Sequence, residues 1–417
     1  MANSVQSLIA LMGHRTYRVY TIGNVISLIG TWMHKVTVGW LTWQLTGSGS
    51  WLGLMAFADL APAILVGPFA GAVADRWNIV KLLKVTQALG GLQAALLGVL
   101  YLSGVLGVEI LFALTLLQGA VTAIAQPSRL ALVSSLVPPD ALGPAVAMNA
   151  VSFNLARFIG PAVAGILLAS TGFASAFAAN AASYVVFFVA LHMLSGVRGE
   201  PARAKDGRRI FGQIGEGLVY VRDTPNVLPV FLIVTGMGLG ARPVVELMPG
   251  YASGVLDGGV TGLAALTSAV GIGAIIGGIW MIGRARSPGL PRLTTFTAAG
   301  SALSVLLLAM AHSLVIAVPI AAVMGGCMVC TGVSTQVLLQ MSVPHAMRGR
   351  ILGLWGLMQR GVPALGALLV GLASDLIGLR AAMCLGTLLL LGIALRVMPR
   401  WFHIGMLGQP PEADSAR

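Results

Sequence analysis

Two stretches of the chain resemble each other and decide the fold. Residues Ser128 to Gly143 read SRLALVSSLVPPDALG, and residues Ser334 to Gly349 read STQVLLQMSVPHAMRG. Both begin with Ser, carry Val-Pro at the same offset and end on Gly, so equivalent positions lie 206 residues apart. Further on, Pro161-Ala-Val-Ala-Gly165 matches Pro363-Ala-Leu-Gly-Ala367. The chain is therefore predicted to contain two similar halves.

Long apolar runs surround both stretches. The 417 residues are 57% hydrophobic and 9% charged, with a mean hydropathy of +0.90, whereas soluble proteins carry roughly 25% charged residues. A helix needs about 20 apolar residues to cross a bilayer, and six such runs are read in each half. They are 19–43, 51–74, 79–102, 110–136, 143–170 and 173–197, then 227–248, 260–282, 293–311, 314–341, 349–373 and 379–397. The runs exclude a large soluble enzyme and predict an all-α polytopic membrane protein, with twelve transmembrane helices in two six-helix bundles.

The basic residues predict how these bundles are oriented. Of the 25 Lys and Arg residues, 20 lie in the tails and in alternate hinges, and the opposite hinges contain only Arg380. Basic hinges stay in the cytoplasm, so both termini are predicted to be cytoplasmic. The predicted units are an N-terminal bundle (1–197), a cytoplasmic linker (198–223), a C-terminal bundle (224–400) and a cytoplasmic tail (401–417).

Several function classes do not fit this pattern. The net charge of +12 is spread over short hinges rather than one folded surface, so no nucleic-acid partner is predicted. Cys327 and Cys330 have the spacing of a metal pair, but they lie in an apolar run, and a structural zinc site needs four ligands together. The His residues are scattered, and no phosphate-binding Gly-Lys-Ser/Thr motif occurs. We therefore predict no metal, no cofactor and no enzymatic activity.

One hinge carries a recognisable motif. Residues Gly67 to Trp77 read GPFAGAVADRW, in which Gly67 and Gly71 share one helical face suited to a tight crossing. Asp75 and Arg76 follow at the predicted cytoplasmic mouth, where a carboxylate can meet the positive end of a neighbouring helix. The segment resembles the G-x-x-x-G-x-x-x-D-R signature between spans 2 and 3 of the major facilitator superfamily. These four residues are therefore predicted to form an inner gate.

The fifth run resembles the antiporter signature of the same superfamily. Gly160, Pro161 and Gly165 stand where that signature kinks the helix and packs it tightly, and a proline inside a span removes a backbone hydrogen bond. Thr115 stands where proton-coupled members carry an Arg in span 4. The resemblance favours an antiporter.

A closer resemblance covers nearly the whole chain and is densest over residues 15–200. It is carried by GTWMHKVTVGWLTWQLTGS (30–48), AQPSRLALVSSLVP (125–138) and MNAVSFNLARFIGPAVAG (148–165). These segments resemble a subfamily of bacterial exporters that includes the enterobactin exporter and macrolide efflux proteins. The resemblance implies a secondary active transporter of the bacterial cytoplasmic (inner) membrane that uses the proton gradient to export an amphipathic small molecule, such as a drug or a siderophore.

Charges inside the apolar runs need a partner or a wet cavity, because a charge at mid-bilayer costs at least about 2.5 kcal/mol. Lys35 lies eight residues before Trp43, and Asp59 lies eight residues after Trp51. Both are therefore about 12 Å from the same end of a helical hairpin and can meet. The pair either stabilises spans 1 and 2 or couples transport to protons through Asp59, which then pairs with Lys35 or Arg157.

Other residues are candidates for lining a substrate cavity. Arg157 and Arg360 lie near the middle of their runs and can attract anionic groups. The remaining candidates are aromatic or amide side chains, namely Trp32, Asn149, Asn154, Trp355 and Gln359. An alternative for the Trp residues is a role as anchors at the membrane interface. Arg242 and Glu246, four residues apart, are predicted to form an intrahelical ion pair.

One chain with two bundles can rock them about a central site without further subunits. We therefore predict a monomeric transporter that works by alternating access, with a small molecule, protons and the lipid bilayer as its partners. Two alternatives stay open. The first is a lysophospholipid or lipid flippase of the same fold. The second is a polytopic lipid-modifying membrane enzyme, which would need carboxylates or His residues clustered at a membrane surface.

Overall fold

The computed structural model describes residues 11–66, 77–138, 141–194, 210–282, 284 and 289–404. Within those ranges the ordered elements are helices, with no β-strand. Ten of these helices are long and apolar enough to cross a membrane. The prediction of an all-α polytopic membrane protein is therefore confirmed.

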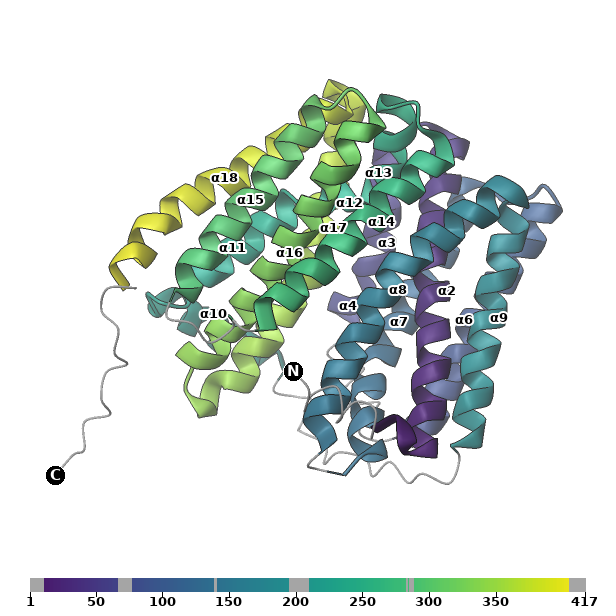
Figure 1. Cartoon of the computed structure of the whole chain (residues 1–417), viewed down its shortest axis with the longest axis horizontal. Helices are drawn as coiled ribbons and strands as arrows, with labels where there is room; N and C mark the ends of the chain where they lie inside the picture. The colour runs from purple at the N-terminus through teal and green to yellow at the C-terminus, as the bar shows by residue number, and fades with distance from the viewer. Residues whose placement is uncertain are drawn as a thin grey trace.

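The helices of the first half of the chain lie together on one side of the molecule, and those of the second half lie on the other (Figure 1). The first group contains α2 (Arg15–Thr46), α3 (Gly49–Leu60), α4 (Pro62–Leu65), α6 (Ile79–Leu102), α7 (Val108–Leu136), α8 (Leu142–Ser170) and α9 (Phe173–Met193). The second contains α11 (Leu228–Leu239), α12 (Arg242–Glu246), α13 (Met248–Gly250), the π-helix η3 (Tyr251–Val255), α14 (Gly259–Ile282), α15 (Leu290–Met310), α16 (Leu314–Ser342), α17 (His345–Ile377) and α18 (Leu379–Ile404).

Large apolar side chains cover much of the outer surface. Leu376 is 86% exposed, Val315 is 84% exposed and Ile282 is 76% exposed. Apolar patches of this kind cause association in water, whereas lipid tails are as apolar as the side chains themselves. The surface therefore fits a protein that crosses the membrane several times.

Most helix ends lie within a few residues of the predicted ones. Helix α6 agrees with the predicted run 79–102 at both ends, and α16 continues only one residue beyond the run 314–341. Helix α18 continues to Ile404, into the predicted tail. Assigned helix ends commonly differ by one or two residues from one method to another. The apolar runs therefore located most of the helices well.

Two predicted spans are interrupted rather than continuous. The run 51–74 begins as α3 and resumes as α4, because Pro62 lacks the N–H group that an unbroken helix would use there. The run 227–248 is divided near Gly240 into α11 and the single turn α12. In transporters, interrupted helices of this kind line cavities rather than lipid.

Part of the sequence prediction lies outside the described residues. This applies to residues 198–209 of the linker and to the predicted inner gate, Gly67, Gly71, Asp75 and Arg76.

The rest of the predicted linker is a helix, α10 (Ile210–Asp223). Arg350 Nη1 of α17 donates a hydrogen bond of 2.6 Å to Glu216 Oε2 of α10. Gly217 of α10 is also buried against Ile351 and Leu354 of α17. The end of the linker therefore contacts the second group of helices.

The two groups meet along α3 with α17 and along α8 with α14. Gly53 of α3 lies directly against the backbone of Ala367 in α17, so no side chain fits there. The Asp375 carboxylate of α17 accepts hydrogen bonds from the Ser48 hydroxyl (2.6 Å) and from the Gly49 N–H (2.8 Å). These contacts join the groups at the end of the molecule where α3 begins.

Candidate functional site

A cavity of about 540 Å³ lies between the two groups of helices. Its wall contains residues of α2, α3, α6, α7, α8 and α9 from the first group, and of α11, α12, α16 and α17 from the second. A smaller cavity of about 100 Å³ adjoins it and shares Lys35, Asp59 and Arg157 with it. Because both groups form its wall, the cavity changes shape when one group moves relative to the other.

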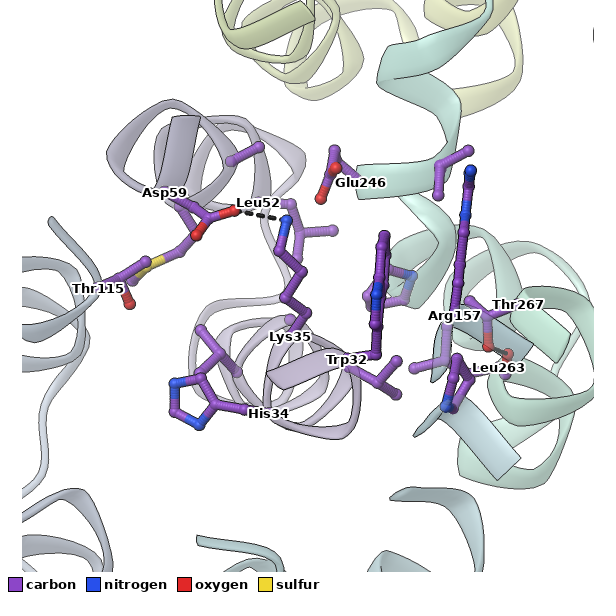
Figure 2. Close-up of a pocket in the computed structure, with 18 of the residues that line it drawn as sticks. Trp32, His34, Lys35, Leu52, Asp59, Thr115, Arg157, Glu246, Leu263 and Thr267 are labelled. Atoms are coloured by element: carbon purple, nitrogen blue, oxygen red, sulfur yellow. Dashed lines mark hydrogen bonds and ion pairs between the residues drawn. The ribbon is translucent and has the colours of Figure 1, made fainter. Parts of the chain in front are cut away.

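Lys35 and Asp59 form an ion pair in this cavity. Lys35 Nζ of α2 lies 2.5 Å from Asp59 Oδ2 of α3, and the two side chains are 30% and 20% exposed. Figure 2 shows the pair between the neighbouring helices. Asp59 belongs to the last turn of α3, just before the break at Pro62. The prediction that the two charges meet is therefore confirmed.

Helix α7 holds the backbone at Asp59. A Cβ atom at Gly119 would lie 2.6 Å from the Ala58 carbonyl oxygen and 2.7 Å from the Asp59 carbonyl oxygen, so this close approach requires glycine. The neighbouring Gln118 lines the cavity and donates a hydrogen bond of 2.5 Å to the Tyr184 hydroxyl. The carboxylate is thus carried by backbone that is packed closely against α7.

Trp32 lies between two cations. Lys35 Nζ is 5.5 Å from the centroid of the indole, and Arg157 Cζ is 5.4 Å from it. Figure 2 shows the indole between these two side chains. Cations within about 6 Å of an aromatic face are attracted to it. Phe153 packs edge-on against Trp32 at 5.6 Å. Trp32 lines the cavity beside these two cations.

The glycines among the predicted kink residues of α8 let this helix lie close to its neighbours. A Cβ atom at Gly160 would lie 2.5 Å from Trp32 Cβ, so α8 approaches α2 at the level of the indole. Gly165 lies directly against Ala264 of α14, and Pro161 lines the smaller cavity. Helix α8 continues through Pro161 without interruption. These residues allow close packing, and a bend at this point stays a prediction.

Three arginines face the cavity without a carboxylate partner. In the described part of the chain, no Asp or Glu oxygen lies within 4.0 Å of the guanidinium nitrogens of Arg157, Arg242 or Arg360. The predicted ion pair between Arg242 and Glu246 is therefore wrong. Arg242 Nη1 instead donates a hydrogen bond of 3.3 Å to Gln359 Oε1 of α17. Arg242 is the first residue of the single turn α12, and its side chain reaches across to α17.

The other predicted cavity residues divide into two sets. Asn154, Trp355 and Gln359 line the cavity, and Trp355 Nε1 is buried without a hydrogen-bond partner among the described residues. Asn149 does not belong to the described residues of the wall. It lies five residues before Asn154, which turns it about 140° around α8.

Sequence reasoning missed several residues of the wall. Glu246 lies beside the Lys35 ammonium group, on the side away from Asp59 (Figure 2). Arg129 is not among the predicted cavity residues, yet it belongs to α7, lines the cavity and donates a hydrogen bond to Asn24 Oδ1 at 3.2 Å. The signal for both is a charge in an apolar run within three residues of a proline, where a break or a cavity is expected.

The wall carries an excess of positive charge. Its described residues include two carboxylates, Asp59 and Glu246, and five cations, for a formal net charge of +3 with His34 counted as neutral. The cations are Lys35, Arg129, Arg157, Arg242 and Arg360. The arrangement can hold an anionic group, and a carboxylate in an ion pair can exchange a proton.

Solved structures of several transporters share this fold. A peptide transporter is similar with a TM-score of 0.76 and 12% identity, over 94% of this chain and 95% of that one. A bacterial homologue of the iron transporter ferroportin, in the inward-facing state, is similar with a TM-score of 0.70 and 15% identity, over 94% and 98%. At these identities the likeness shows the fold.

Relatives found by sequence are transporters and efflux pumps. The multidrug efflux pump Tap of Mycolicibacterium fortuitum is 25% identical over 90% of this chain and 93% of its own. The enterobactin exporter EntS of Shigella boydii is 26% identical over 88% and 86%. The staphyloferrin A transporter of Staphylococcus aureus is 29% identical over 38% of this chain, and the match spans 40% of that protein.

The family model described as "transmembrane secretion effector" matches residues 6–403, which is nearly the whole chain. The motifs of residues 15–200 resemble those of major facilitator superfamily exporters, and the relatives above include such exporters. The chain belongs to the transmembrane secretion effector family of this superfamily of secondary transporters.

Proposed function

We propose that the chain is a proton-driven exporter of an amphipathic small molecule in the bacterial cytoplasmic membrane. The observation that carries the proposal is the Lys35–Asp59 ion pair, which lies in a cavity bounded by both groups of helices. Ionisable residues inside a membrane commonly mark ion or proton pathways. Export of a drug or a siderophore is supported by the names of the relatives.

The proposal includes an architecture of twelve crossings. The 32-residue helix α2 and the interrupted α3–α4 pair add two crossings to the ten long apolar helices. Six crossings in each of residues 1–197 and 224–400 return the chain to its starting side. Both termini and the linker 198–223 are then cytoplasmic, and the protein works as a monomer. The contact between α3 and α17 would close the outer side in this arrangement.

The coupling step follows from the ion pair. When Asp59 is charged, its charge balances that of Lys35, and the ion pair holds α2 and α3 together. A proton on Asp59 removes its charge, so Lys35 loses its partner and Glu246 is the next carboxylate beside it. The cation then interacts with a residue of the other half, which favours a different arrangement of the halves. A protein that exchanges Asp59 protonation with substrate occupancy is an antiporter.

The test replaces Asp59 with Asn in full-length protein in inverted membrane vesicles. We expect D59N to lose proton-driven uptake of its substrate but to keep substrate exchange without a gradient, because a neutral side chain can no longer bind or release a proton. The probes are iron-free enterobactin and ethidium, which represent the siderophore and drug classes. The matched control is D223N, since Asp223 is exposed and lies outside the cavity wall.

Proton-driven uptake by D59N at the wild-type rate would contradict the coupling role of Asp59. Movement of a labelled lysophospholipid in the same vesicles, with neither probe transported, would identify the protein as a lipid flippase instead.

A further inference from the structure

The three unpaired arginines of the cavity act on one another. Arg242 lies within electrostatic range of both Arg157 and Arg360. Glu246 is the carboxylate close enough to attract Arg157 and Arg242, and it forms no ion pair within 4.0 Å in the described part of the chain. The described wall of the cavity holds five cations and two carboxylates, so its cations repel one another in a site of low dielectric constant.

The protein offers these cations few acceptors of its own. The Arg242 guanidinium donates to a neutral amide, that of Gln359. Arg157 makes a cation–π contact with Trp32, and no hydrogen bond joins it to a described residue. A cation within the membrane needs an anionic partner or water to lower its free energy. Asp59 and Glu246 are the carboxylates of the described wall, and an anion from outside the chain would supply the further partner that these cations favour.

The wall beside Arg157 suits the apolar part of such a ligand. Trp32 and Phe153 form an aromatic corner next to the guanidinium. The buried Trp355 Nε1 group, which also belongs to the wall, has no acceptor among the described residues. A volume of about 540 Å³ is in the range that binds drug-sized molecules. Aromatic surface, an unused donor and planar cations together match an aromatic or amphipathic acid.

We infer that the cavity binds organic anions, with the carboxylate or an equivalent acidic group held by Arg157 together with Arg242 and Arg360. The guanidinium group binds a carboxylate with two parallel hydrogen bonds, which gives both attraction and orientation. The apolar body of the anion lies against Trp32 and Phe153. This inference deepens the proposed function, since it names the substrate class of the same cavity.

The test measures equilibrium binding to full-length protein in nanodiscs of zwitterionic lipid, with no proton gradient. The probes are radiolabelled 1-naphthoate and 1-naphthamide, which match in size but differ in charge. We expect the acid to bind at least about tenfold more tightly than the amide, since a charge-assisted hydrogen bond contributes about 1.5 kcal/mol or more. R157Q should weaken binding of the acid by about the same factor, and R157K by less.

The matched control is R284Q. Arg284 also stacks on an indole, with its Cζ 4.2 Å from the Trp280 ring, but it lies outside the cavity wall. This variant should bind the acid as the wild type does.

Equal affinity for acid and amide, an unchanged affinity in R157Q, or no binding of the acid up to about 10 mM would each overturn the inference. A parallel measurement uses nanodiscs that also contain anionic lipid. Competition between this lipid and 1-naphthoate would identify a lipid headgroup as the source of the acid. Because no gradient is used, failure here leaves the D59N transport test intact, and failure of that test leaves the binding result intact.

Discussion

Helices α3 and α17 touch at one end of the molecule and line different parts of the cavity wall further along. At the touching end, Gly53 lies against the backbone of Ala367, with no room for a side chain. From Gly49 to Asp59, α3 rises about 15 Å, and there it carries the carboxylate that pairs with Lys35. The same helices therefore form a backbone contact at one place and a charged cavity at another.

The two places differ in what holds them. At the touching end, small residues let the helices pack closely through van der Waals contacts, and the Asp375 carboxylate adds hydrogen bonds from Ser48 and Gly49. The cavity charges need a partner in every arrangement, so each step of a cycle must supply one. Changes at the touching end should therefore alter the side to which the cavity opens. Changes within the cavity should alter what it binds.

The largest effect is expected from breaking the touching end with Gly53→Val. The side chain would meet the Ala367 carbonyl group and lie near 3.1 Å from Leu368 Cα, which are backbone atoms that no rotamer change can move. Overpacking of this kind costs about 3 kcal/mol. We expect the closed end to open and transport to fall about 100-fold.

Pulsed electron paramagnetic resonance can measure this opening between spin labels at position 102, where α6 ends, and position 315, where α16 begins. Gly278→Ala is the matched control, because a Cβ atom there meets no heavy atom closer than 3.9 Å. An unchanged label distance together with wild-type transport would show that the contact is not a gate. Loss of protein from the membrane fraction would instead assign Gly53 to folding.

A smaller effect is expected from Gly160→Ala, which changes the cavity and leaves the touching end intact. The added methyl group would lie 2.5 Å from Trp32 Cβ and 2.9 Å from the Met33 nitrogen, so α8 must move away from α2. Arg157 then loses its stacking position on Trp32. We expect 1-naphthoate to bind about tenfold more weakly (about 1.4 kcal/mol), with label distances at the touching end unchanged.

The control for this change lies on the same helix. Gly143→Ala adds a methyl group where no heavy atom lies within 4 Å, and it should leave binding unchanged. Wild-type affinity in the Gly160 variant would show that the close approach of α8 to α2 does not position Arg157.

The contrast between the two places also explains what the sequence could predict. Lys35 and Asp59 could be placed together because a short hinge joins their helices, and distance along each helix is enough to align them. The Arg242–Glu246 prediction failed because spacing within a helix ignores the helix opposite, where Gln359 accepts the hydrogen bond. Depth along two helices joined by a short hinge was predictable, whereas the partner that a side chain finds on a helix distant in sequence was not.

The direction of a side chain around its helix was equally hard to predict. Asn149 and Asn154 occupy one apolar run, yet only Asn154 belongs to the described wall of the cavity. Which face of α8 is turned inward depends on the fit of Gly160 against Trp32 and of Gly165 against Ala264. The apolar runs carry no such information, because both faces of a membrane helix are apolar when lipid covers one and protein the other.

The smallest effect is expected from Asp375→Ala, which weakens the touching end without adding bulk. The carboxylate accepts hydrogen bonds from the Ser48 hydroxyl at 2.6 Å and from the backbone N–H groups of Gly49 (2.8 Å) and Ser50 (3.2 Å). It therefore caps the start of α3 from another helix, and loss of a cap costs about 1 kcal/mol. We expect the closed arrangement to become about fivefold less populated, which the same two spin labels report.

Glu109→Ala provides the control for the loss of charge. Glu109 is an exposed carboxylate in the first turn of α7, and it makes no hydrogen bond with another helix in the described part of the chain. Its removal should leave the distance distribution unchanged. If Asp375→Ala and Glu109→Ala gave the same distribution, the glycine contact alone would hold the end closed, and the cap would contribute only to the start of α3. A shift confined to Asp375→Ala would show that a charged group on one half and backbone N–H groups on the other help to set the equilibrium.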